Sequence, residues 1–231
     1  MKLKDRVALI TGGSSGIGKA AALDMVKEGA KVAITARRLE RLEEAKKEIE
    51  AAGGEVLALA GDVQHPEHVE KLVEDTVARW GRLDIVVANA GINGVFAPIE
   101  DITPEEWDQT HQINVKGTFM TVKYSIPHLR AAGGGSVIVV SSVNGNRIFS
   151  NFGFTAYSAS KAAQVAFTKM AAMELAQWKI RVNVVCPGAT KTSINENTFP
   201  RDIDKIRIPR EFPDGMIPLE QRPADSHEVS S

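Results

Sequence analysis

The sequence predicts an α/β fold, in which a single doubly wound parallel sheet carries helices on both faces. Six short apolar segments predict the strands, at 7–11, 31–35, 55–60, 83–88, 136–140 and 181–185. Each segment is apolar almost throughout, which is typical of parallel strands that are buried on both faces. Segments with helical character separate them, so we expect parallel pairing through right-handed crossovers.

Helix boundaries are marked along the chain. Gly29, Gly53 and Gly81 are each expected to end one of the first three helices. The segment 103–106 reads Thr-Pro-Glu-Glu, which offers an N-cap, a proline at the first helical position and a glutamate at the third. We expect helical sequence from there to about residue 132. A long helix should begin near Phe154, after the fifth strand.

Composition narrows the class of protein. The chain is 43% hydrophobic and 25% charged, with a formal net charge of −1. These values give no electrostatic basis for binding nucleic acid or an anionic membrane. Cys186 is the single cysteine, so we expect no intrachain disulfide and no metal site. No segment approaches the roughly 20 apolar residues of a membrane span, and we expect a cytoplasmic protein.

A glycine-rich turn joins the first strand to the first helix. It reads Thr-Gly-x-x-x-Gly-x-Gly over 11–18. Such a turn gathers backbone N–H groups and a helix N-terminus at one point, which suits the pyrophosphate of a dinucleotide. The alternative is a tight turn without a ligand. The candidate cofactor-binding residues in this turn are Gly12, Ser14, Ser15, Gly16, Ile17 and Gly18.

The end of the second strand bears on the choice of cofactor. An acid at this place accepts from the 2′-hydroxyl of NAD, whereas an arginine accommodates the 2′-phosphate of NADP. The sequence has Arg37 and Arg38 there, with no acid before Glu40. We therefore predict NADP(H) in preference to NAD(H), with Arg37 as the main contact. Arg38 has an alternative, which is pairing with Glu40 or Glu43 on the exposed helix.

Tyr157 and Lys161 lie one turn apart on the long helix that is expected near Phe154. A free tyrosine has a pKa of about 10 and is a poor proton shuttle at neutral pH. A neighbouring ammonium group favours the phenolate and lowers that pKa. The pair is therefore suited to exchanging protons with an alcohol or a carbonyl. On its own, the spacing more often belongs to two ordinary surface side chains.

Taken together, these motifs resemble the short-chain dehydrogenase/reductase family over nearly the whole chain. The matching motifs are, in order, the loop 11–18, Asp62–Val63, Asn89–Ala90–Gly91, Asn114, Ser141–Ser142, Tyr157 with Lys161, and Pro187–Gly188 with Thr190 and Thr192. The resemblance implies a Rossmann-type domain. It also implies an oxidoreductase that transfers a hydride between a nicotinamide cofactor and a ketone or secondary alcohol.

The resemblance implies roles for these residues. Tyr157 would be the general acid or base, Ser142 would orient the substrate oxygen, and Ser141 is an alternative partner for that oxygen. Lys161 would lower the pKa of Tyr157 and hold the nicotinamide ribose, and Asn114 would help to hold a water in a proton relay. The remaining matches would bind the cofactor: Asp62 and Val63 at the adenine, Asn89, Ala90 and Gly91 beside it, and Pro187, Gly188, Thr190 and Thr192 near the nicotinamide.

We treat residues 1–231 as one dinucleotide-binding catalytic domain, with a mobile substrate loop at 189–223. Two features depart from the family pattern. Ser142 and Tyr157 are about two residues further apart than in many members, which would lengthen the pocket loop 144–153. The chain also stops near the start of the family's last helix, so that helix and a seventh strand are expected to be missing.

The substrate and the partners are less well defined by sequence. Both a 3-oxoacyl-acyl-carrier-protein reductase and a sugar or polyol dehydrogenase fit the motifs, and aromatic residues in the pocket loops favour a moderately apolar carbonyl or alcohol substrate. A homo-oligomer, dimer or tetramer, is expected if the C-terminus is complete. Two alternatives are a C-terminally truncated inactive form and a non-catalytic dinucleotide-binding protein.

Overall fold

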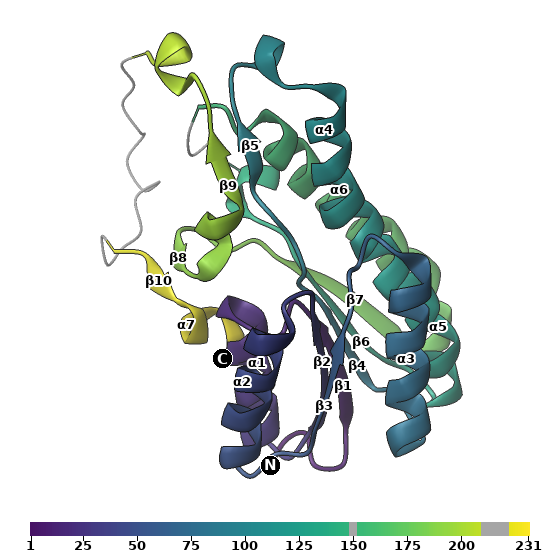
Figure 1. Ribbon diagram of the computed structural model, residues 1–231. Coiled ribbons are helices and arrows are strands. Elements are labelled where there is room, and N and C mark those ends of the chain that lie inside the picture. Colours follow the sequence, from purple (N-terminus) through teal and green to yellow (C-terminus); the bar gives the residue numbers. More distant parts are fainter. Residues whose placement is uncertain (148–151, 209–221) are drawn as a thin grey trace.

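A parallel sheet of six strands, in the order β3-β2-β1-β4-β6-β7, forms the centre of the computed structural model (Figure 1). The strands are β1 (Val7–Thr11), β2 (Lys31–Ala36), β3 (Val56–Ala60), β4 (Ile85–Ala88), β6 (Gly135–Val140) and β7 (Ile180–Val185). The predicted strands are confirmed, with ends that differ by two residues at most. The order reverses between β1 and β4, so the sheet is doubly wound as predicted. The structure describes residues 1–147, 152–208 and 222–231.

Helices cover both faces of this sheet (Figure 1). On one face lie α1 (Gly16–Lys27) and α2 (Leu39–Ala51), and on the other α3 (Pro66–Trp80), α5 (Gly117–Ala131) and α6 (Thr155–Leu175). Two shorter helices, α4 (Pro104–His111) and α7 (Ser226–Ser230), pack mainly against other helices. A π-helical turn, Gln112–Lys116, joins α4 to α5. The expected capping box is present, because Thr103 and Glu106 each accept a hydrogen bond from the other's backbone N–H.

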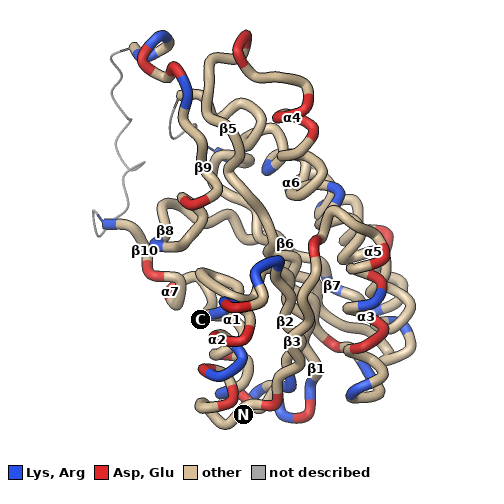
Figure 2. Tube along the Cα trace, in the orientation of Figure 1, with Lys and Arg blue, Asp and Glu red and all other residues tan. Residues whose placement is uncertain are grey.

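The core consists of two apolar layers, one on each face of the sheet. Leu9 and Val86 point to the layer formed with α3, α5 and α6. Ile10 and Ile34 point to the opposite layer, formed with α1 and α2. Charged side chains lie on the helices and loops and are nearly absent from the strand interiors (Figure 2). Burial on both faces explains why the strands are apolar almost throughout.

The C-terminal segment contains more structure than the sequence predicts. Strand β8 (Thr190–Lys191) pairs with β10 (Ala224–Asp225), and β9 (Thr198–Pro200) pairs with β5 (Gly94–Phe96). These pairs hold parts of the segment 189–223, for which we predicted a loop. Residues 209–221 of that segment, and 148–151 of the predicted pocket loop 144–153, lie outside the described residues.

The chain ends in α7, which packs against α1. His227 Nδ1 lies 2.7 Å from a carboxylate oxygen of Asp24, and Ser230 Oγ donates to the same carboxylate at 2.6 Å. Within the described ranges, no strand follows β7 in the central sheet. Among the described residues, no helix has the length and apolar character that a membrane span needs.

Candidate active site

A cavity of about 740 Å³ lies at the carboxyl ends of the central strands. The loop between β1 and α1, the ends of β2, β4 and β6, the start of α6 and the segment 187–197 all contribute to its walls. The cavity spans the point between β1 and β4 where the strand order reverses. Open α/β sheets bind their ligands at such a point, and the volume suits a small molecule or a cofactor.

The glycine-rich turn is held in place by the end of β4. Asn89 Nδ2 donates to the carbonyl oxygens of Thr11 and Gly12 at 2.9 and 3.1 Å. Thr11 Oγ1 accepts from the backbone N–H groups of Asn89 and Ala90, both at 3.1 Å. A Cβ on Gly18 would lie 2.5 Å from both Asn89 Nδ2 and the Gly12 oxygen. Glycine is therefore required where the turn and the end of β4 touch.

The N-terminus of α1 points into the cavity region without a side-chain cap. Its N-cap residue, Ser15, makes no capping hydrogen bond, and the first turn carries no acidic residue. The N–H groups of this turn, together with the helix dipole, favour an anion. Ser14, Ser15 and Ile17 line the cavity. The turn therefore fits the pyrophosphate of a dinucleotide.

Tyr157, Lys161 and Ser142 line the same cavity. All three are less than a tenth exposed. Lys161 Nζ donates to the backbone oxygen of Val140 at 3.0 Å and lies 5.7 Å from the centre of the Tyr157 ring. Ser142 Oγ accepts from the backbone N–H of Asn144 at 3.2 Å. Ser141 Oγ instead donates to the backbone oxygen of Lys161 at 2.8 Å.

Burial dominates the acid–base properties of this group. It raises the pKa of Tyr157 above the ordinary tyrosine value, and a hydrogen bond with Ser142 offsets part of the change. It also lowers the pKa of Lys161 to about 8, with Cys186 opposing the change. The expected lowering of the Tyr157 pKa by Lys161 is therefore wrong for this structure. Desolvation of the phenol is the larger effect, because the ammonium group is directed to a carbonyl of β6.

Lys161→Met removes a buried charge and should change how the free energy of unfolding depends on pH. The pKa of Lys161 falls from 10.5 to about 8, so burial disfavours the ammonium by about 3 kcal/mol. Between these two pH values the unfolded chain binds more protons than the folded one, so stability rises with pH. The variant should therefore be more stable relative to the parent below pH 8. That advantage should shrink by about 3 kcal/mol as the pH approaches 10.5.

Urea unfolding of both proteins from pH 7 to 10.5 measures this difference. Titration of Tyr157 occurs in both chains and cancels when the unfolding free energies are subtracted. A difference that does not change with pH would show that Lys161 is not desolvated as the structure indicates.

Asn114 lies behind the cavity, in the π-helical turn Gln112–Lys116. Its side chain accepts from Ile92 N and donates to Ile92 O, both at 2.9 Å, and donates to Ser160 Oγ at 3.0 Å. Its backbone oxygen accepts from Gln164 Nε2 at 2.8 Å. π-Helical turns are frequent at functional sites. Asn114 thus joins the segment after β4 to the helix that carries Tyr157.

Two contacts beside Lys161 were missed by sequence reasoning. Gln164 is fully buried, and its Nε2 also donates to Thr118 Oγ1 at 2.7 Å. A glutamine one turn beyond Lys161 in an alanine-rich helix is the only signal for it. A Cβ on Gly145 would lie 2.4 Å from the backbone carbon of Lys161. The turn after Ser142 therefore packs directly against α6.

The arginines at the end of β2 contact the segment after Thr192. Arg37 and Arg38 line the cavity. Arg38 Nη1 donates to Glu196 Oε2 at 2.6 Å, and Arg37 Nη2 donates to Asn197 Oδ1 at 3.4 Å. The alternative that Arg38 pairs with Glu40 or Glu43 is wrong, since its carboxylate partner is Glu196. That partner is 158 positions away in sequence.

The other predicted cofactor residues surround the same cavity. Asp62, Val63, Asn89, Ala90, Gly91, Pro187, Gly188, Thr190 and Thr192 all line it. Thr192 lies against Gly16, where an added Cβ would be 3.1 Å from its side chain. Of the predicted site residues, only Gly18 and Asn114 do not line the cavity. Gly18 lies in the helix behind the turn, and Asn114 is fully buried.

The fold and this site define a class, the dinucleotide-binding α/β proteins. Residues 6–202 match the model of the family described as short chain dehydrogenase. The human dehydrogenase/reductase SDR family member 4 is 40% identical over 197 residues, which are 84% of this chain and 69% of that protein. A 3-ketoacyl-ACP reductase from Sinorhizobium meliloti 1021 superposes with a TM-score of 0.91 at 48% identity, covering 97% of this chain and 88% of the other.

The chain belongs to the short-chain dehydrogenase/reductase family. It is an oxidoreductase of the type that acts on CH–OH or keto groups. Two relatives have been solved with cofactors. A Brucella melitensis 3-ketoacyl-(acyl-carrier-protein) reductase, 32% identical with a TM-score of 0.85 over 99% of this chain and 88% of that one, contains NADH. A Burkholderia cenocepacia J2315 short chain dehydrogenase, 30% identical with a TM-score of 0.83 over 100% and 89%, contains NADP.

Proposed function

We propose that this protein is an NADP(H)-dependent oxidoreductase that interconverts a ketone and a secondary alcohol, with Tyr157 as the general acid or base. The observation that carries the proposal is that Tyr157, Ser142 and Lys161 line the same cavity as the glycine-rich turn. A non-catalytic dinucleotide-binding protein would need no buried phenol and ammonium there.

Each polar group has a part in the proposed reaction. Burial keeps the Tyr157 phenol protonated at neutral pH, which suits it to donate a proton to a carbonyl oxygen during reduction. Ser142 lines the same cavity, and its hydroxyl is proposed to donate a hydrogen bond to that oxygen. In the oxidation direction, the phenol must first lose its proton, and the Tyr157 phenolate then accepts the proton of the alcohol. The nicotinamide cofactor, when bound, supplies or accepts the hydride.

Lys161 and Asn114 support this arrangement from behind. With a pKa of about 8, Lys161 is mostly charged at neutral pH, so its ammonium can hold the hydroxyl groups of the nicotinamide ribose. Asn114 joins Ile92 to α6 through its side chain. We propose that the proton lost by Tyr157 is replaced through a relay on this side of the site. Ser141 is the weaker candidate for the substrate oxygen, because its hydroxyl donates to α6.

The arginines at the end of β2 support NADP(H) over NAD(H). Arg37 and Arg38 line the cavity, and the end of β2 offers no acid before Glu40 to accept from the 2′-hydroxyl of NAD. Guanidinium groups bind phosphate through paired, charge-assisted hydrogen bonds. Relatives solved with NADH and with NADP occur within the same fold. The fold therefore does not fix the preference, and Arg37 and Arg38 support NADP(H) in this chain.

A carbonyl panel tests the proposed function. NADPH and NADH oxidation would be followed by absorbance with 3-oxoacyl thioesters, cyclic diketones and keto sugars. We expect reduction of at least one ketone, and the moderately apolar ones should be preferred. With that ketone, kcat/KM should be about tenfold higher for NADPH than for NADH, because one ionic contact to the 2′-phosphate contributes on the order of 1.4 kcal/mol.

The outcomes of this panel separate the parts of the proposal. No turnover with any ketone or with the matching alcohols would contradict the catalytic proposal. Turnover that is equal with the two cofactors, or faster with NADH, would contradict the argument from the arginines alone.

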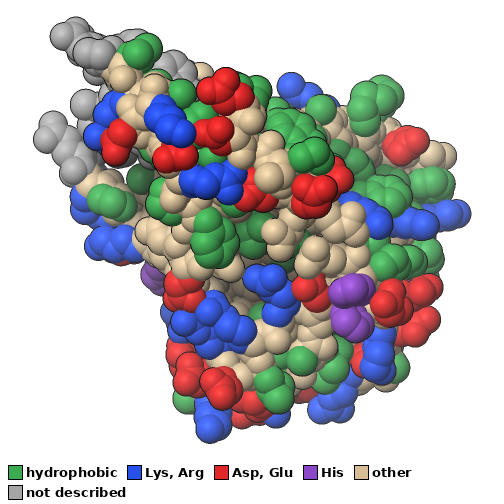
Figure 3. Space-filling view, turned by 45° about the horizontal axis from the view of Figure 1, so that its top comes forward, with side chains coloured by type: hydrophobic (Ala, Val, Ile, Leu, Met, Phe, Trp, Pro, Cys, Tyr) green, Lys and Arg blue, Asp and Glu red, His purple; other side chains and the backbone are tan. Residues whose placement is uncertain are grey.

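A homo-oligomer and a cytoplasmic location remain further proposals. The helices α5 and α6 expose the apolar side chains of Phe119, Met170 and Met173, which are 45%, 59% and 70% exposed. Such side chains are a plausible subunit contact. On the face in Figure 3, acidic and basic side chains are mixed, and no large patch of one sign is visible there.

A further inference from the structure

The segment after Thr192 is tied to the arginines at the start of α2. Glu196 lies in the 3-10 helix Ser193–Asn197. Its Oε2 accepts from Arg38 Nη1 at 2.6 Å and lies 2.9 Å from Arg41 Nη1. A single carboxylate therefore lies between two guanidinium groups. One of these, on Arg38, belongs to the pair that the proposed function assigns to the 2′-phosphate of NADP(H).

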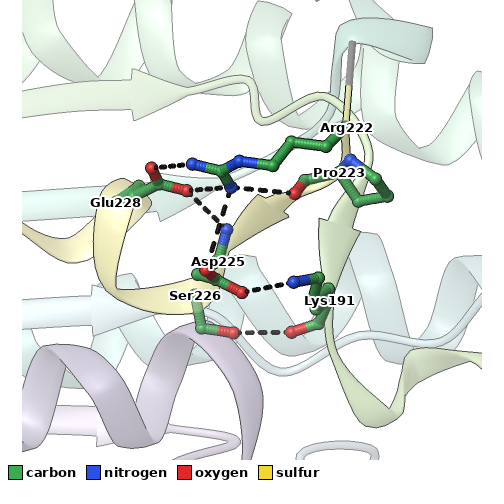
Figure 4. Close-up of polar contacts among 6 residues, drawn as sticks. All are labelled: Lys191, Arg222, Pro223, Asp225, Ser226 and Glu228. Carbon is green, nitrogen blue, oxygen red and sulfur yellow. Dashed lines mark hydrogen bonds and ion pairs between the residues drawn. The ribbon is translucent and has the colours of Figure 1, made fainter. Parts of the chain in front are cut away.

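The fold holds Glu196 in this position from both sides. Before it, β8 pairs with β10, and the Lys191 ammonium lies 3.1 Å from the Asp225 carboxylate. The Ser226 hydroxyl donates to the backbone oxygen of Lys191 at 2.9 Å. Figure 4 shows these contacts. It also shows Arg222, whose Nη2 donates to Glu228 Oε1 at 2.7 Å next to Asp225.

The other side of the segment is held as well. After Glu196, β9 pairs with β5, and Asn93 Nδ2 donates to Thr198 Oγ1 at 2.8 Å. At the start of the segment, Ser193 Oγ lies 2.7 Å from Ser15 Oγ in the glycine-rich turn. Strand pairs on both sides of the segment therefore hold Glu196 beside the arginines.

A carboxylate and a phosphate make the same kind of contact with a guanidinium group. Both accept paired, charge-assisted hydrogen bonds. The carboxylate is anionic at neutral pH, and Arg38 and Arg41 hold the pKa of Glu196 below its usual range. Two anions at one guanidinium repel each other. Binding of a 2′-phosphate at Arg38 therefore requires Glu196 to be displaced. The ion pair is half exposed, and pairs of this kind are weak enough to be exchanged.

We propose that Glu196 is a cofactor-specificity residue, which competes with the 2′-phosphate of NADP(H) for Arg38 and so reduces the selectivity for NADP(H) over NAD(H). NAD(H) carries a hydroxyl group at this place and need not displace the carboxylate. The inference rests on the proposed function, since it concerns the same cofactor site. It also implies that NADP(H), and not NAD(H), releases the segment 193–197 from α2.

Glu196→Gln tests the inference through cofactor affinity. Fluorescence titration of the whole protein with NADPH and with NADH would give both dissociation constants. We expect NADPH to bind about fivefold more tightly to the variant, which is the upper range for an exposed ion pair. NADH affinity should stay within about twofold. An unchanged or weaker NADPH affinity, or an equal gain for both cofactors, would overturn the inference.

Glu40→Gln is the matched control. Glu40 lies in the first turn of α2, beside the same arginines, and it is exposed. Its replacement removes the same charge from the same neighbourhood, but no ion pair of Glu40 occurs in the described part of the chain. The ratio of the two dissociation constants should not change in this variant. A gain equal to that of Glu196→Gln would show a general charge effect and would contradict the inference.

A double variant links the effect to the arginine. In an Arg38→Ala background, the gain from Glu196→Gln should fall to about twofold or less, because the contested donor is absent. A gain of full size in that background would contradict competition at Arg38. Glu196→Ala serves as a second variant if Gln retains a hydrogen bond to the guanidinium, and it should give the same direction of change.

Separate measurements test the competition by Glu196 and the proposed preference for NADP(H). The parent protein's own ratio of dissociation constants tests the preference for NADP(H). The change in that ratio on replacing Glu196 tests the competition. A parent that prefers NADH, but whose Glu196→Gln variant gains NADPH affinity, would correct the cofactor and leave the inference in place.

Discussion

Tyr157→Phe is expected to lower kcat by about 10³-fold or more, which is within the range for loss of a general acid. The variant loses one oxygen from a side chain that is 7% exposed. The ring keeps its contact with Phe154, whose centre is 5.6 Å away. NADPH affinity should therefore stay within about twofold, because Lys161 and the glycine-rich turn are unchanged. Steady-state absorbance and fluorescence titration measure the two quantities.

Tyr124→Phe is the matched control for this experiment. Tyr124 and Tyr157 are the two tyrosines of the chain, and Tyr124 lies on α5 against the core. Its replacement removes a phenol hydroxyl from a packed helix without touching the cavity, so activity should be retained. The proposed role of Tyr157 would be wrong if Tyr157→Phe kept more than a tenth of the activity, or if both variants lost activity equally.

Asn114→Ala is expected to lower the free energy of unfolding by about 3–5 kcal/mol, because it leaves buried donors and acceptors without partners. The Asn114 side chain is 0% exposed, and it serves the N–H and the carbonyl of Ile92 as well as Ser160. Loss of these bonds should also loosen Gly91, whose Cβ position would lie 3.5 Å from Lys161 Nζ. Activity should therefore fall together with stability.

Urea unfolding measures the change, with Asn183→Ala as the control. Asn183 is an exposed asparagine on the edge strand β7, and its loss should change the free energy of unfolding by about 0.5 kcal/mol or less. If Asn114→Ala unfolded at the same urea concentration as the parent protein, the hydrogen bonds around Ile92 would contribute little. Asn114 would then not be the residue that positions this part of the site.

The central sheet could be predicted because its signals are local. The apolar strands and the glycines at 29, 53 and 81 are each visible within a few residues of sequence, and so is the capping box at Thr103. The glycine-rich turn and the Tyr157–Lys161 spacing are local in the same way. Their meeting in one cavity follows from the topology, because parallel strands place their carboxyl ends on one edge of the sheet.

The features that escaped prediction depend on contacts between distant segments. The strand pairs β5–β9 and β8–β10 are two or three residues long, too short to show periodicity. Glu196 was not considered for Arg38 because 158 positions separate them. The direction of the Tyr157 pKa was also missed, since desolvation is a property of the packed site and the spacing of Tyr157 and Lys161 carries no information on it.

The most direct measurement is a crystal structure of the protein with NADP⁺ and an alcohol or ketone that the carbonyl panel identifies as a substrate. We predict that the substrate oxygen lies within hydrogen-bond distance of both the Tyr157 hydroxyl and the Ser142 hydroxyl, with the reacting carbon facing the nicotinamide ring. A substrate oxygen bound by another group, with the Tyr157 hydroxyl out of reach, would contradict the account.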